Sequence, residues 1–201
     1  MGSRILPLTS APAAAFSALA PARRVLACGE GAPSLAMELS ALSVCEGRPV
    51  VFLCGDNRFD PYVVSAAARR RGLNQGSALE RILIARAFTA YQLSELVLRL
   101  KAPQEQQGFV IISGLCASFF DEDLSHNDAA RLFYRTLWRI VELTQTGLSL
   151  LIAEKPVEIN SRRAYFLTDL IRLSQVVLRL DGRESFRLEH KTRPAQTLLL
   201  N

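Results

Sequence analysis

The stretch Val50-Val-Phe-Leu-Cys-Gly-Asp-Asn-Arg-Phe-Asp-Pro61 decides the fold class of this chain. Its five consecutive apolar residues predict a strand that is buried on both faces, as in a parallel sheet covered by helices. Gly-Asp-Asn predicts a turn, and Asp60 before Pro61 predicts the start of a helix, with Asp60 as its N-cap. The stretch therefore predicts one strand–turn–helix unit of an α/β protein.

Outward from this unit, short apolar runs alternate with helical patterns in both directions. We expect strands at 24–28, 50–54, 81–85, 109–112 and 148–153, and helices at 34–44, 61–71, 90–100 and 128–143. Two alternating runs at 175–180 and 185–190, joined by Asp181-Gly182, predict a C-terminal hairpin. The pattern predicts an N-terminal lead or capping segment at 1–23 and a single α/β domain at 24–201, with a mostly parallel central sheet.

Composition excludes a mainly disordered chain, because 49% of the 201 residues are hydrophobic. The net charge is +5, and its distribution is uneven. Residues 161–201 hold eight Lys and Arg against four Asp and Glu, so nearly all of the excess lies in the last fifth of the chain. A basic binding face there explains this better than general solubility does.

The four cysteines form no Cys-x-x-Cys pair and have no His at ligand spacing, so we expect neither a metal site nor a bound cofactor. Three of them lie in or beside apolar runs, which is typical of buried free thiols in a reducing compartment. No apolar run approaches the ~18 residues of a membrane span. Three prolines interrupt the apolar lead, unlike a secretory signal. The expected location is cytoplasmic, or nuclear in a eukaryote.

Several short motifs, in order along the chain, resemble the ATPase core of the RecA/RadA recombinases. They are Val51–Pro61, Arg71-Gly-Leu73, Ile84-Ala-Arg-Ala-Phe88 with Gln92, Phe109–Leu115, Val177–Leu180 and Leu188–Pro194. The resemblance covers roughly residues 20–195. It implies a RecA-like, P-loop-type three-layer sandwich with the antiparallel hairpin at its C-terminal end.

The nucleotide motifs of that family are degenerate here. ATP binding needs G-x-x-x-x-G-K-[ST], whose amides and Lys hold the phosphates and whose hydroxyl holds Mg²⁺. The corresponding turn, Gly29-Glu-Gly-Ala-Pro-Ser34, has no Lys, and Pro33 removes an amide donor. The family's metal-organising Asp falls at Ser113. The degenerate site comprises Gly29, Glu30, Gly31, Ser34, Asp56 and Ser113, and we expect little or no ATP binding and no catalysis.

The resemblance also implies two DNA-facing loops, after the fourth and fifth strands. The first, at 119–128, carries four carboxylates and no Lys or Arg, which disfavours DNA. The second ends at Arg162-Arg163. Candidate DNA-binding residues are Arg162, Arg163, Arg172, Arg183, Arg187, Lys191 and Arg193. An equally supported alternative is a solvated face, ion-paired to Asp169, Asp181, Glu184 and Glu189. Tyr165 and Phe166 could stack on bases, although core packing is favoured for both.

These features together predict a non-catalytic RecA/RadA-like paralogue, an accessory or regulatory subunit in DNA recombination and repair. Its expected partner is a RecA/RadA-type recombinase or another paralogue, in a hetero- or homo-oligomer, with DNA as a candidate ligand and no membrane. Candidate docking residues in the lead are Ile5, Leu6, Leu8 and Phe16; alternatively, the lead caps the chain's own sheet. One alternative function is a regulatory RecA-superfamily module outside recombination, such as in signalling. Unrelated enzyme chemistry is disfavoured, because no G-x-S-x-G elbow or activated Cys occurs.

Overall fold

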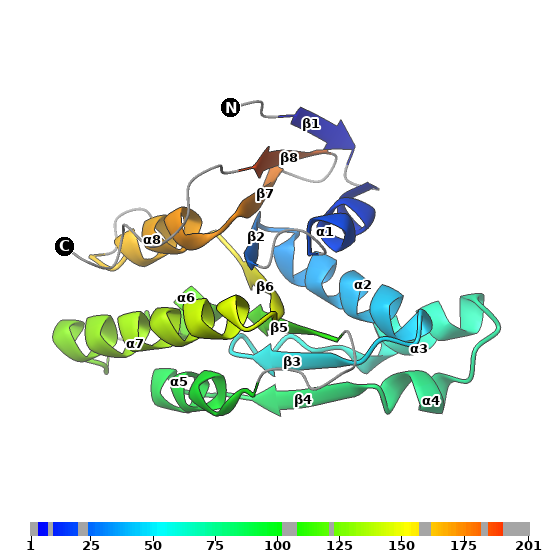
Figure 1. The fold of residues 1–201 in the computed structure, drawn as a ribbon, viewed down its shortest axis with the longest axis horizontal. Helices are drawn as coiled ribbons and strands as arrows, with labels where there is room; N and C mark the ends of the chain where they lie inside the picture. Colours follow the sequence, from blue (N-terminus) through cyan, green and yellow to red (C-terminus); the bar gives the residue numbers. More distant parts are fainter. Residues whose placement is uncertain are drawn as a thin grey trace.

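The computed structural model describes residues 4–7, 10–19, 24–101, 108–120, 123–156, 162–181 and 185–190. Figure 1 shows a mixed sheet with helices on both faces. The strands are β1 (Arg4–Pro7), β2 (Arg24–Gly29), β3 (Val50–Cys54), β4 (Ile82–Arg86), β5 (Phe109–Ser113), β6 (Ser149–Glu154), β7 (Val176–Asp181) and β8 (Ser185–His190). The helices are α1 (Ala11–Leu19), α2 (Ala32–Cys45), α3 (Pro61–Arg70), α4 (Gln75–Leu79), α5 (Ala90–Arg99), α6 (Leu115–Ser118), α7 (His126–Gln145) and α8 (Tyr165–Leu173).

The sheet has eight strands in the order β1-β8-β7-β2-β6-β5-β3-β4. The run from β7 to β4 is parallel throughout, whereas β8 pairs antiparallel with β7 and β1 antiparallel with β8. The predicted α/β class, the mostly parallel sheet and the C-terminal hairpin are therefore confirmed. The order also leaves β1 at one edge of the sheet and β4 at the other.

Both faces of the sheet are buried, because successive side chains of each strand enter two different cores. In β2, Val25 and Ala27 pack with α1, α2, α3 and α4, while Leu26 and Cys28 pack with α5, α6, α7 and α8. This is why the central strands are continuous apolar runs rather than alternating ones. Of the four cysteines, Cys28, Cys54 and Cys116 are buried, as predicted.

The predicted strands agree with the observed ones to within one residue at each end. Asp60 caps α3 as expected, since its side chain accepts a hydrogen bond from the Tyr62 amide. The predicted helix at 128–143 is longer and begins after Ser125, whose hydroxyl accepts from the Asp128 amide. Short helices α4 and α6 were not predicted, because four or five residues do not establish a helical period. The nine-residue α8 was also missed.

The N-terminal lead contributes a strand and a helix to the same body. β1 pairs with this chain's own β8, in register from Arg4–Leu188 to Pro7–Ser185. Helix α1 buries Ala11, Ala15 and Ala18 against the core. The boundary predicted at residue 23 lies outside the described residues and stays a prediction. Among the described helices, none is long and apolar enough to cross a membrane.

Candidate functional site

Four parallel strands place polar residues at or just after their carboxyl ends, which lie along one side of the sheet. β2 is followed by Glu30, β3 by Asp56, β5 ends at Ser113 and β6 at Glu154. The chain leaves β2 over the α2 face toward β3, and it leaves β6 over the α8 face toward β7. Neighbouring strands whose connections diverge in this way open a crevice at their carboxyl ends, which is the usual ligand position in α/β sheets. The residues of the predicted degenerate nucleotide site therefore lie around the carboxyl ends of the strands, where an α/β sheet usually binds its ligand.

The turn between β2 and α2 is too short to cradle phosphates. Only Glu30 and Gly31 lie between the last residue of β2 and the first of α2. Gly29 has a φ of 129°, and a Cβ there would collide with the Leu180 carbonyl oxygen of β7. The strand end is therefore packed against its neighbour, with no room for a looping backbone.

The start of α2 also offers few donors and the wrong charge to a phosphate. Pro33 stands in the first turn and has no N–H, and the Leu35 amide is used by the Gly31 carbonyl at 2.9 Å. The Glu30 carboxylate lies 3.5 Å from Lys155 Nζ across the β2–β6 crevice. Both side chains are partly exposed, so this ion pair adds little stability, but it places a carboxylate between the turn and the Lys155 cation. Ser34 is exposed on α2 and does not join this pair.

The structure does bring Asp56 and Ser113 together, as predicted. The Ser113 hydroxyl donates to Asp56 Oδ2 at 2.7 Å, and the Arg58 amide donates to Oδ1 at 3.2 Å. The Cys54 thiol contacts Asp56 Oδ1 at 3.5 Å. Burial raises the pKa of Cys54, and the negative charge of Asp56 raises it further. Asp56 thus acts as a turn residue whose oxygens are held by its own neighbours.

The space beside Asp56 is filled by backbone. Gly114 adopts the left-handed conformation with a φ of 73°, and a Cβ there would lie 2.7 Å from the Asp56 Cβ. A Cβ on Gly55 would lie 2.9 Å from the Gly114 carbonyl oxygen. The Ser118 hydroxyl contacts both glycine carbonyl oxygens, at 3.3 and 3.0 Å. Two glycines and a serine therefore pack closely against one side of Asp56.

The residues present do not fit a nucleotide–Mg²⁺ complex. Across the described residues, no group of three or more His, Cys, Asp and Glu side chains is arranged to hold a metal ion. The short turn after β2 and the serine at position 113 thus differ from the phosphate turn and the metal-organising Asp that P-loop phosphoryl transfer uses.

Glu154, the last residue of β6, also lies at the carboxyl ends of the strands, and the sequence analysis did not identify it. It is 1% exposed, and its Oε1 accepts a 2.8 Å hydrogen bond from the Cys116 amide. Burial raises the pKa of Glu154 to about 8; the Cys116 amide opposes this, and the Asp56 charge adds to it. A carboxylate directly after the buried run 148–153 was the available signal, since that position falls at the same edge as Asp56 and Ser113.

The candidate DNA-binding arginines do not form one free basic face in the part of the chain that the structure describes. Arg163 donates to the carbonyl oxygens of Phe119, at 2.7 Å, and of Leu124, so it holds the start of the acidic segment in place. Arg172 lies 3.5 Å from Asp169, and Arg187 lies on β8 opposite Arg179. Arg162 is exposed. Arg183, Lys191 and Arg193 lie outside the described residues.

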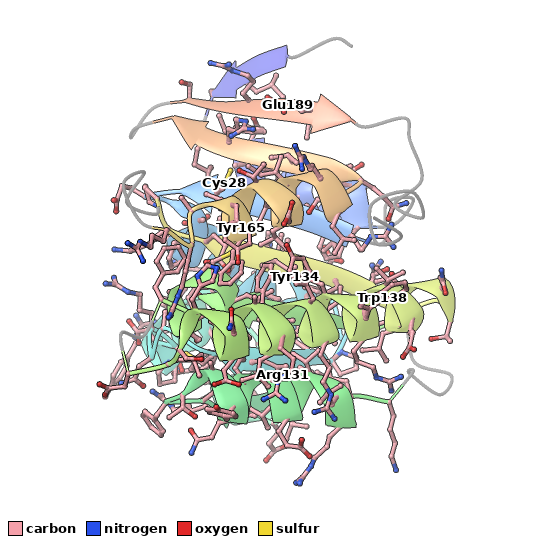
Figure 2. All side chains as sticks on the ribbon, turned by 90° about the vertical axis from the view of Figure 1, so that its left-hand side faces the viewer. Cys28, Arg131, Tyr134, Trp138, Tyr165 and Glu189 are labelled. Atoms are coloured by element: carbon pink, nitrogen blue, oxygen red, sulfur yellow. The ribbon has the colours of Figure 1, made fainter. Side chains whose placement is uncertain are left out.

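The aromatic pair beside these arginines belongs largely to the core. Phe166 is fully buried and stacks on Phe133, with ring centroids 4.2 Å apart and planes at 22°. In Figure 2, Tyr165 and Tyr134 lie where α8 and α7 meet, and the Tyr134 hydroxyl donates to Asp169 at 2.7 Å. Core packing is therefore confirmed for Phe166, which leaves no face of that ring for a base.

An exposed apolar edge is the most unusual surface of the described structure. Among the described residues, β4 pairs with β3 and with no other strand, so one side of its backbone has no partner strand there. Leu83 is 67% exposed, Ile84 39%, and Phe88, just after the strand, 73%. A groove of about 580 Å³ adjoins this edge between α5 and α7, with Arg86, Tyr91 and Leu132 in its lining. Sequence reasoning predicted the strand but not its exposure.

The docking residues predicted in the lead are placed differently. Residues 4–7, which include Ile5 and Leu6, form β1 on this chain's own β8, so that edge is already paired. Phe16 packs edge-on against Phe109, with ring centroids 6.4 Å apart, under the Arg48 guanidinium. Leu8 lies outside the described residues. A docking role for these residues stays a prediction, and β4 is the edge that remains open.

A comparison with models of known protein families and one with curated proteins both find no match for this chain.

Proposed function

We propose that this chain is a non-catalytic RecA/RadA-like paralogue that serves as an accessory subunit in DNA recombination and repair. It acts through a protein partner, an active recombinase or another paralogue, that docks on the β4 edge. The ordered motifs of the sequence support the family, and the mixed sheet with helices on both faces is compatible with it. A short β2–α2 turn, and a serine at position 113 where the resembled family has an Asp, support the loss of catalysis.

The exposed β4 edge is the observation that carries the proposed mode of action. An unpaired strand with large apolar side chains is a hazard in a free protein, and natural proteins cover or charge such edges. Here Leu83 and Phe88 are more than two-thirds exposed. A partner strand added to β4 would satisfy its free N–H and C=O groups, while its side chains would cover Leu83 and Phe88. Function by partner binding is compatible with a scaffold that has lost its nucleotide chemistry.

The test is affinity capture from the source cell with three forms of the chain. We expect the wild-type protein to retain a RecA/RadA-type recombinase or its paralogue. Leu83→Lys should reduce that recovery at least tenfold, because it puts a charge in the docking edge without removing a core contact. The matched control is Tyr62→Lys, which changes an 80% exposed side chain on α3 and should capture as the wild type does.

Two results would contradict the proposal. Recovery of signalling proteins without any recombination protein would favour a regulatory module outside recombination. Equal recovery with Leu83→Lys and Tyr62→Lys would show that the partner does not use β4. A separate measurement addresses DNA: binding of the complex to a single-stranded oligonucleotide should weaken steeply with salt if arginines contact phosphates.

A further inference from the structure

A second groove lies on the other side of the sheet from α5 and α7. It has a volume of about 490 Å³ and runs over α2, between α1 and α3, which flank α2 in Figure 1. Ala41 and Leu42 of α2 form its floor, and Val63 and Ala67 of α3 form one wall. The volume falls within the ~300–1,000 Å³ of ordinary ligand pockets. The middle of the groove is therefore apolar and large enough for several aliphatic side chains.

Three charged residues line the groove beside its apolar residues. Arg70 and Arg71 line it where α3 ends, and Arg69 precedes them. Glu38 lines it on α2, one turn before Leu42. Each of α2 and α3 follows a strand of the parallel run, so the two helices point the same way. The groove is thus lined by two arginines at the end of α3, its basic end, and by one carboxylate on α2.

The basic end is not neutralised within the described part of the chain. Other arginines there pair with carboxylates, for example Arg99 with Glu95 and Arg131 with Asp128, both at 2.8 Å. No such ion pair involves Arg69, Arg70 or Arg71 among the described residues. One basic residue in a last turn suffices to complement a helix dipole. Three consecutive arginines beside an apolar groove exceed that need and suit a carboxylate-bearing ligand.

We propose that this groove binds a segment of a partner protein that carries a cluster of Asp and Glu beside aliphatic residues. The aliphatic side chains cover Ala41, Leu42 and Ala67, while the carboxylates meet Arg70 and Arg71. Such a segment is an amphipathic helix laid in a groove, with apolar anchors at i, i+3, i+4 and i+7. Nucleic acid fits less well, because a continuous phosphate backbone would pass Glu38 and leave the apolar walls uncovered.

The groove and the β4 edge are independent surfaces. The groove is built from α1, α2 and α3, whereas the β4 edge offers Leu83 and Phe88, neither of which lines the groove. The inference rests on the groove's own lining and charges, not on the proposed function. A variant that fails at one surface leaves the other intact, so the two proposals fail separately.

The test uses a fluorescently labelled 14-residue peptide amide as the probe. It carries an Asp-Asp-Glu cluster followed by Leu at i, i+3, i+4 and i+7, and its binding to the full chain is measured by fluorescence anisotropy. We expect saturable binding that Arg70→Glu with Arg71→Glu weakens at least tenfold. Ala67→Trp, which fills the groove without changing charge, should abolish it. The matched control is Arg58→Glu with Arg135→Glu, an equal charge change on exposed residues outside the groove, which should bind within twofold of the wild type.

Several outcomes would overturn the proposal. These are no saturable binding to the wild type, unchanged binding to Ala67→Trp, or equal binding of a peptide with Lys in place of Asp and Glu. Displacement of the peptide by a single-stranded oligonucleotide at low salt, with no effect of Ala67→Trp, would indicate a phosphate site instead. Sedimentation of the free chain as a dimer that Ala67→Trp dissociates would show that a second copy occupies the groove.

Discussion

At the residue scale, adjacent arginines before α8 have opposite roles. Arg163 is half-buried and donates to two carbonyl oxygens of the 119–124 segment, whereas Arg162 is exposed. Charged hydrogen bonds of this kind contribute about 1.5–3 kcal/mol. We expect Arg163→Ala to lower the free energy of unfolding by about 2 kcal/mol in a urea titration.

Arg162→Ala is the matched control, because it removes the same group from the neighbouring position. It should change the free energy of unfolding by less than ~0.5 kcal/mol. Equal effects of the two substitutions on stability would contradict a stabilising role for the hydrogen bonds from Arg163 to Phe119 and Leu124. If only Arg162→Ala lowers DNA affinity, the second loop contacts DNA through its exposed arginine alone.

Glu154 makes stability depend on pH. Its pKa rises from the ordinary 4.5 to about 8 in the folded protein, mainly through burial. A carboxyl with a raised folded pKa favours the native state fully below its unfolded pKa, and this contribution is lost as the pH rises through the folded pKa. The window therefore runs from about pH 4.5 to about pH 8. The loss of stability across it is on the order of a few kcal/mol, because a tenfold change in a proton-binding constant corresponds to ~1.4 kcal/mol.

Glu154→Gln keeps a neutral group that still accepts the Cys116 hydrogen bond. We expect the difference in unfolding free energy between the variant and the wild type to increase in the variant's favour from pH 5 to pH 9. Urea titrations at several pH values measure it. A difference that stays constant with pH would contradict the raised pKa of this group.

At the element scale, α3 depends on the cap that the sequence predicted. Asp60 accepts from the Tyr62 amide at 2.9 Å, and Pro61 occupies the first helical position. We expect Asp60→Ala to cost about 1 kcal/mol, measured by urea or thermal unfolding. Gln75→Ala, an exposed change in the first turn of α4 that removes no cap, is the control and should be nearly neutral. Equal losses would show that the Asp60 cap contributes nothing.

The elements that could be predicted are those whose signal is local. Five consecutive apolar residues at Val50–Cys54 indicate a doubly covered strand wherever it lies, and Asp60-Pro61 indicates a helix start without tertiary contacts. The β4 run begins with four apolar residues, Ile82 to Ala85, yet Leu83 is exposed because β4 falls last in the strand order. Strand order is set by non-local pairing, so no local pattern in this stretch marks it as an edge.

The candidate site could be predicted only in part, for the same reason. Asp56 and Ser113 each follow an apolar strand, and their contact follows from two strands that end at one edge of a sheet. Glu154 carried the same signal and was overlooked. The role of Arg163 depended on a backbone segment about 40 residues earlier in the chain, which sequence spacing does not reveal.

At the scale of the whole molecule, the protein is a doubly covered α/β sheet with a short β2–α2 turn at the expected ligand position and with β4 as an outer strand among the described residues. We propose that it does not bind or hydrolyse ATP. Isothermal titration of the purified chain with ATP and Mg²⁺, followed by a phosphate-release assay, tests this most directly. An active RecA-type ATPase under the same conditions serves as the control. The account predicts no saturable heat and no phosphate release above the buffer rate. Tight, Mg²⁺-dependent binding with turnover would contradict it.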